Sequence, residues 1–155
     1  MARISAEHVN TFLMAASKVI SETCNLTTKV GKPYIRNNTF TKDSIVIMIG
    51  VTGEMQGQVM LAFKKSVALM IASKMMYMEV KELDEISISA ICELGNMIMG
   101  NASTAFSVKN IGIDITPPTM CEGDFTVSGA VASMCIPIYI SDTDFVELNL
   151  CIRQD

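Results

Sequence analysis

Several residue types are scarce in this chain of 155 residues, and each scarcity excludes a class of site. Tryptophan is absent, and His8 is the only histidine. Sites that need two histidines, such as the H-E-x-x-H zinc site or a two-histidine iron site, are therefore excluded. A Ser-His-Asp or Cys-His arrangement would depend on His8 alone. The sequence also lacks the glycine spacing of a P-loop.

Cysteines are few and scattered. The chain has five, an odd number, and no two are spaced as C-x-x-C: Cys24, Cys92, Cys121, Cys135 and Cys151. A zinc site would have to be assembled from distant thiols, so we expect no metal site. Reduced and mostly buried thiols are the better interpretation.

Positive charge and long apolar runs are also in short supply. The net charge is −4, from 12 Lys+Arg against 16 Asp+Glu, so we expect no electrostatic binding of nucleic acid. Apolar runs such as Ile45 to Ile49 are far shorter than the roughly 20 residues of a membrane helix. The first residues do not follow the pattern of a signal peptide. With 50% hydrophobic residues, the sequence predicts a soluble, cytoplasmic protein with a single domain, residues 1–155.

Hydrophobic spacing predicts three helices, which run from Ser5 to about Thr23, from Lys64 to Tyr77 and from Asp84 to Val108. Strands are predicted at Thr27 to Ile35, Ser44 to Thr52, Gln56 to Phe63, Val131 to Ile140 and Phe145 to Ile152, with a short strand near Asp114-Ile115. Turn signals occur at Asn37-Asn38, Gly53-Glu54 and Ser141 to Asp144. Consecutive hairpins require an antiparallel sheet, and amphipathic helices need a face to pack on. We therefore predict an α+β fold with two to three helices packed on a mostly antiparallel β-sheet.

The helix predicted from Asp84 to Val108 carries the polar groups best suited to chemistry. At about 100° per residue, four of its residues fall within about 60° of one another: Ser89, Glu93, Asn96 and Gly100. The opposite side is an apolar stripe for the sheet, formed by Ile91, Leu94, Ile98, Ala102 and Ala105. A carboxylate and an amide thus lie one turn apart on the outward face.

Methionines and glycines accompany this face. Met97 and Met99 are expected at its margins, where flexible thioethers suit a surface that must fit a partner. Gly95 and Gly100 each cost about 1 kcal/mol relative to alanine, which indicates close approach of something to the backbone. An exposed Glu and Asn at this spacing also occur by chance on many helices, and glycines also serve helix–sheet packing. The spacing alone therefore fits both a functional site and an ordinary exposed helix face.

Four stretches resemble one known family. The stretch from Ala90 to Ala102, AICELGNMIMGNA, resembles the E-x-x-N signature helix of the CheX/CheC/FliY chemotaxis phosphatases. Residues 49–59 resemble their hairpin, with glycines placed as in the CheX branch. Residues 136–148 resemble the C-terminal hairpin, and residues 9–16 resemble the first CheX helix. The resemblance covers nearly the whole chain and identifies it as a CheX-like member of this family.

The resemblance implies a phosphatase that accelerates hydrolysis of the aspartyl phosphate on a CheY-like response regulator. By the family's mechanism, Asn96 orients the attacking water and Glu93 pairs with the receiver's lysine. Ser89, Met97 and Gly100 are then expected to contact the receiver. No cofactor of its own is expected, because the receiver supplies the divalent metal, Mg²⁺. The resemblance also implies a homodimer formed by joining sheet edges, and the C-terminal hairpin is expected to offer such an edge.

Two other functions stay open at this point. A non-catalytic adaptor on the same scaffold could bind a receiver domain or a flagellar-switch component. The intact Glu93, Asn96 and Gly100 favour the enzyme, because an adaptor has no need of the amide. A small-molecule-binding domain is the other possibility, but the sequence offers no polar cluster outside this helix to support it.

A second E-x-x-N motif occurs at Glu7 and Asn10, on the first predicted helix. The match is thinner, because Met14 stands where the other motif has Gly100. A bulky Met14 would obstruct insertion into a receiver pocket. A solvated helix face, with an N-terminal acid favoured by the helix dipole, is the better interpretation.

Overall fold

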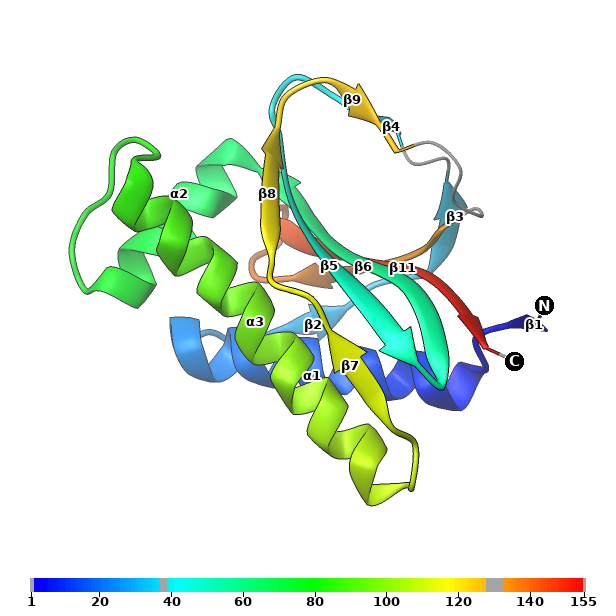
Figure 1. Cartoon of the computed structure of the whole chain (residues 1–155). Coiled ribbons are helices and arrows are strands. Elements are labelled where there is room, and N and C mark those ends of the chain that lie inside the picture. Colours follow the sequence, from blue (N-terminus) through cyan, green and yellow to red (C-terminus); the bar gives the residue numbers. More distant parts are fainter. Residues whose placement is uncertain (1, 37–38, 128–132, 155) are drawn as a thin grey trace.

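The computed structural model describes residues 2–36, 39–127 and 133–154 of the chain. Within these residues, three helices cover one face of a nine-stranded sheet, as Figure 1 shows. The helices are α1 (Ala6–Cys24), α2 (Lys65–Met76) and α3 (Glu85–Val108). Every strand pairing is antiparallel. The predicted α+β fold is confirmed, and each helix begins within one residue of its predicted start.

Two long hairpins form the centre of the sheet. β5 (Ser44–Gly53) pairs with β6 (Met55–Lys64), and Gly53 makes the turn between them with a φ of 101°. β10 (Ser133–Tyr139) pairs with β11 (Phe145–Gln154), and β11 also pairs with β6. Short strands flank them: β1 (Ala2–Arg3) on β11, β2 (Lys29–Val30) and β3 (Tyr34–Arg36) on β10, and β7 (Ile113–Ile115) and β8 (Thr119–Glu122) on β5.

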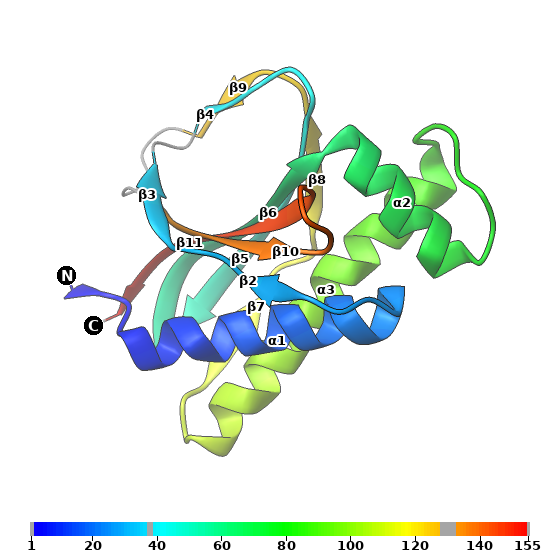
Figure 2. The same cartoon turned by 180° about the vertical axis from the view of Figure 1, so that it is seen from behind.

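A small arm stands over the face of the sheet that lies away from the helices. It consists of β4 (Thr39–Phe40) and β9 (Phe125–Thr126), which form a separate two-stranded sheet. Figures 1 and 2 show this arm on the side opposite the helices. Phe40 stacks on Phe125 with ring centroids 5.0 Å apart, and Phe40 packs in a second, smaller core with Val46, Met60 and Ala62.

The main core lies between the sheet and the helices, and it positions α3. Phe12 of α1 and Phe106 of α3 meet edge to face with ring centroids 4.9 Å apart. Gly95 faces the sheet, where a Cβ would lie 2.9 Å from Cγ2 of Ile47 and 3.2 Å from Cδ1 of Ile49. The close approach predicted at Gly95 is therefore that of α3 to β5.

Three strand predictions need correction. The strand predicted from Thr27 to Ile35 is divided into β2 and β3, and Pro33 between them has no N–H for the ladder. The C-terminal hairpin does not offer a sheet edge, because β10 is flanked by β2 and β3 and β11 is flanked by β6. Four strands were not predicted: β1, β4, β8 and β9.

Two sequence predictions fall outside the described residues, namely the turn at Asn37-Asn38 and positions 131 and 132 of a predicted strand. Among the helices that the structure describes, none has the length and apolar character needed to span a membrane.

Candidate functional site on helix α3

A capping box fixes the start of α3. The Asp84 carboxylate accepts a hydrogen bond from the backbone N–H of Ser87 at 2.8 Å, and Ser87 Oγ accepts one from the backbone N–H of Asp84 at 2.8 Å. Hydrogen bonds from the Ser87 backbone and side chain lower the pKa of the Asp84 carboxyl below its ordinary value. The helix therefore begins at a defined residue, which sets the direction in which every later side chain points.

The outward face of α3 has the composition that the spacing predicted. Ser89, Glu93 and Asn96 are exposed, and Gly100 is half-buried. The predicted apolar stripe faces inward: Ile91, Leu94, Ile98 and Ala102 are buried, and Ala105 is half-buried. Neither Glu93 nor Asn96 has a hydrogen-bond or ion-pair partner within the described ranges. Their carboxylate and amide groups are therefore free to engage a partner.

Met97 and Met99 differ in how deeply they are buried. Met97 is half-buried against the core and lies at the margin of the face, as predicted. Met99 is fully buried, so the prediction that it borders the face is wrong. It lies about 20° from Phe106 around the helix, and Phe106 contacts Phe12 and His8 of α1. Met99 therefore belongs to the side of α3 that packs on α1.

Nothing in the part of the chain that the structure describes requires glycine at position 100. A Cβ at this position would meet no heavy atom within 4 Å. The helix continues regularly around it, since Thr104 Oγ1 donates to the Gly100 carbonyl at 3.1 Å and Asn101 Nδ2 donates to the Met97 carbonyl at 3.0 Å. Unlike Gly95, which the sheet approaches, Gly100 leaves an open stretch of helix backbone beside Asn96.

The cysteine nearest this face is Cys92. Burial raises the pKa of its thiol above the ordinary value, so the thiol is protonated at neutral pH. All five cysteines are free, and Cys24, Cys135 and Cys151 are buried. These features fit packed thiols and agree with the sequence interpretation.

The sequence also matches known proteins along most of its length. Residues 45–140 match the family described as "Chemotaxis phosphatase CheX". The chain is 32% identical over 155 residues to the CheY-P phosphatase CheX of Thermotoga maritima, with 97% of this chain and 99% of the relative covered. The chain belongs to the CheX family. The family membership that the sequence indicated is thereby confirmed.

Solved structures of CheX-like proteins share the fold of this CheX-family chain. The CheX subunit of a CheX–CheY–BeF3–Mg complex from Borrelia burgdorferi has a TM-score of 0.80 at 27% identity, with 98% of this chain and 100% of that chain covered. A CheC-like superfamily protein from Shewanella sp. PV-4 has a TM-score of 0.83 at 24% identity, covering 97% of this chain and 99% of that one.

The second E-x-x-N motif of this CheX-family chain has different surroundings. Glu7 Oε1 lies 3.6 Å from Nζ of Lys109, at the end of α3, and Lys109 Nζ also donates to Thr11 Oγ1 at 2.9 Å. Met14 is 72% exposed and projects from the same face as Asn10. The acid is therefore already paired, and a large side chain stands where α3 has Gly100.

Sequence reasoning missed a polar cluster on the arm side of the sheet. Glu147 is buried and accepts hydrogen bonds from the Tyr34 hydroxyl, from Nη1 of Arg36 at 3.1 Å and from Nδ2 of Asn149 at 2.8 Å. Arg36 also lies 4.7 Å above the Phe40 ring, so the cluster ties the arm to the sheet. The expectation of no polar cluster outside α3 is wrong. The polar residues at alternate positions of β11 could have indicated a polar cluster on one face of the sheet.

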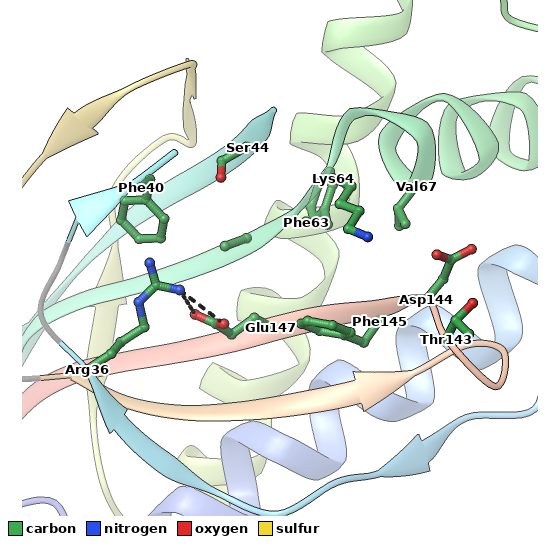
Figure 3. Close-up of a pocket in the computed structure, with 11 residues that line it drawn as sticks. Arg36, Phe40, Ser44, Phe63, Lys64, Val67, Thr143, Asp144, Phe145 and Glu147 are labelled. Atoms are coloured by element: carbon green, nitrogen blue, oxygen red, sulfur yellow. Dashed lines mark hydrogen bonds and ion pairs between the residues drawn. The ribbon is translucent and has the colours of Figure 1, made fainter. Parts of the chain in front are cut away.

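A cavity of about 130 Å³ lies beside this cluster, between the arm, the end of β6 and the β10–β11 turn. Figure 3 shows Arg36 and Glu147 at one side of it and Lys64 and Asp144 at the other. Glu147 is satisfied by its own neighbours, so we interpret the cluster as structural. The cavity is separate from the Glu93 and Asn96 face, which lies on α3.

Proposed function

We propose that this chain accelerates hydrolysis of the aspartyl phosphate on a CheY-like response regulator, with α3 as the docking helix. The observation that carries the proposal is the exposed, unpaired Glu93 and Asn96 pair beside the open backbone of Gly100. The substrate class is supported by the Thermotoga maritima relative, which is named CheY-P phosphatase.

The reaction needs few catalytic groups from this protein, because an acyl phosphate already hydrolyses in water. The Asn96 amide can accept a hydrogen bond from the attacking water and donate one to a phosphoryl oxygen, much as a glutamine orients water in GTPases. Such orientation supplies on the order of 10²-fold or more in rate. The Mg²⁺ ion belongs to the receiver, the substrate of this reaction. A complex of a related CheX with CheY, BeF3 and Mg supports that assignment.

Glu93 has the second role, which is to fix the docking register. Its carboxylate would pair with the receiver's active-site lysine one turn away from the inserted amide. An ion pair at about 4 Å contributes about 1 kcal/mol in water and more once the interface excludes water. Ser89, Met97 and Gly100 border the pair and complete the contact surface. We also propose that the protein acts in the cytoplasm, because its five free cysteines suit a reducing compartment.

The deciding experiment measures phosphate release from a phosphorylated CheY-like receiver. Wild-type protein should accelerate release, and Asn96→Ala should lower kcat about 100-fold with little change in KM. Glu93→Gln should both raise KM and lower kcat. Asn101→Ala is a matched control, since Asn101 is an exposed amide on the same helix about 140° from Asn96. Equal losses of binding in the Asn96 and Glu93 variants would refute this division of roles.

The same experiment separates the enzyme from an adaptor. Tight binding of the phosphorylated receiver without faster phosphate release would overturn the proposal in favour of a non-catalytic adaptor. Testing a second receiver distinguishes this outcome from a mismatched substrate.

We further propose that the chain forms a homodimer through the β2 and β3 edge of the sheet. Among the described residues, neither strand has a partner on its outer side. Three residues of these strands, Val30, Tyr34 and Ile35, are 44%, 41% and 56% exposed. Exposed apolar edge strands favour pairing with another chain. Light scattering should give a dimer mass for the wild type and a monomer mass for Ile35→Lys. Val108→Lys, at the far end of α3, is the control that should remain dimeric. A monomeric wild type would contradict the proposal.

A further inference from the structure

An apolar strip runs along α3 beside the polar pair. Ile86, in the first turn of the helix, is 67% exposed although it is a large apolar residue. At about 100° per residue, it lies within about 20° of both Glu93 and Met97 around the helix. Ala90 lies between Ile86 and Met97 along the helix, and both Ala90 and Met97 are half-buried. The apolar strip of Ile86, Ala90 and Met97 therefore follows the Glu93 side of the site.

The polar pair needs such a surface, because it provides geometry but little affinity. Exposed ion pairs contribute about 0–1 kcal/mol. Most of the binding energy of protein interfaces comes from a few buried anchors. A standard interface covers about 800 Å² on each partner, which corresponds to a disc of about 16 Å radius. Along the helix axis, Ile86 lies about 10 Å from Glu93 and about 15 Å from Asn96. It is therefore inside the footprint of any partner centred on the pair.

The other exposed apolar residue of α3 lies outside that footprint. Val108 is 81% exposed, and it and Ile86 are the large exposed hydrophobic side chains in the described residues of this helix. Val108 is about 18 Å beyond Asn96 and about 120° away around the helix. The two residues therefore differ in position but not in chemistry, which makes them a natural pair for comparison.

We propose that Ile86 is the apolar anchor by which α3 binds the receiver. The preferred receiver carries an exposed apolar side chain next to its phosphorylation site, on the side of the lysine that meets Glu93. This inference rests on the proposed function of α3 and adds the source of its affinity.

The test compares Ile86→Ser, Ile86→Leu and Val108→Ser. Serine matches isoleucine and valine closely in helix propensity, so the fold should be retained. Two quantities are measured: the Kd for a CheY-like receiver loaded with beryllofluoride and Mg²⁺, and the KM and kcat of phosphate release. Because burial of an exposed isoleucine contributes substantially to association, Ile86→Ser should raise both Kd and KM about tenfold with kcat unchanged. Ile86→Leu and Val108→Ser should behave as the wild type.

Each outcome either supports or overturns the proposal that Ile86 is the anchor. Wild-type affinity in Ile86→Ser overturns the anchor while the phosphatase activity of the wild type stands. A lower kcat with unchanged KM also overturns it, because the residue would then act on helix geometry. If the wild type binds the receiver without hydrolysis and Ile86→Ser still weakens binding, the anchor stands and the proposed catalysis fails. No binding by the wild type overturns both proposals.

Discussion

Replacing Gly100 by alanine should change the stability of the fold and the activity toward the receiver in opposite directions. Alanine is about 1 kcal/mol better than glycine inside a helix. Beyond its own helix turn, the added Cβ meets no heavy atom of the described residues within 4 Å. The free energy of unfolding should therefore rise by about 1 kcal/mol, which raises Tm by about 2–4 °C for a chain of this size. If the receiver packs against the Gly100 backbone, the same methyl group overfills the interface at a cost of about 1–3 kcal/mol.

The expected result is a more stable but poorer enzyme. A penalty of about 1–3 kcal/mol corresponds to a loss of roughly 5- to 150-fold in kcat/KM. Thermal unfolding followed by circular dichroism gives the stability, and phosphate release from the phosphorylated receiver gives the activity. Gly95→Ala is the matched control, because its Cβ would lie 2.9 Å from Ile47 Cγ2. That contact offsets the propensity gain, so Gly95→Ala should not be stabilised.

One result would refute the reasoning about Gly100. If Gly100→Ala gains stability and keeps full activity, no partner approaches the backbone there, and the glycine has no role in docking. A loss of both stability and activity would instead show that the residue is needed inside the fold. Only the opposed changes support a close contact with the receiver.

Three further predictions concern the rest of the molecule. Glu147→Ala should lower the free energy of unfolding, measured in urea, by about 3 kcal/mol. This is the low end for a broken buried ion pair, because Arg36 keeps 29% of its side chain exposed. An unchanged urea midpoint would contradict this prediction. Asp84→Ala should lower Tm at neutral pH, and the difference from wild type should vanish in acid. The lowered pKa of Asp84 means that its charge stabilises the fold above the ordinary value of 3.8 and that this stabilisation is lost as the pH falls through the folded value. Glu7→Gln should leave phosphatase activity within about twofold of wild type, since surface changes away from special features are nearly neutral; a large loss would reveal a second site.

The helices and long hairpins were predictable because their signals are local. Ser5 and Asp84 each cap a helix at the predicted start. In both cases the side chain accepts a hydrogen bond from the backbone N–H of the third residue of the helix. The face of α3 followed from helical periodicity alone. Met99 was misplaced because the direction of α1 across α3, which decides what is buried at the margins, is a tertiary feature.

The arm and the sheet edges were not predictable for the same reason. β4 and β9 are each two residues long, and they are held by the stack of Phe40 on Phe125 and by Arg36 above Phe40. The stack joins residues 85 positions apart in the sequence and leaves no periodic signal. The position of the C-terminal hairpin inside the sheet likewise depends on strand order, because β2 and β3 cover β10.

The two E-x-x-N helices show which part of the motif carries information. Both place a carboxylate and an amide one turn apart near the surface, so the four-letter pattern alone does not distinguish them. The difference lies one turn later, where α3 has the open Gly100 and α1 has the projecting Met14. A group that must reach into a partner's pocket needs a small neighbour, because the helix itself has to approach the rim of that pocket. Glu7 is also paired with Lys109, whereas Glu93 has no partner among the described residues. The steric and electrostatic surroundings of the pair, rather than its spacing, therefore assign the proposed chemistry to α3.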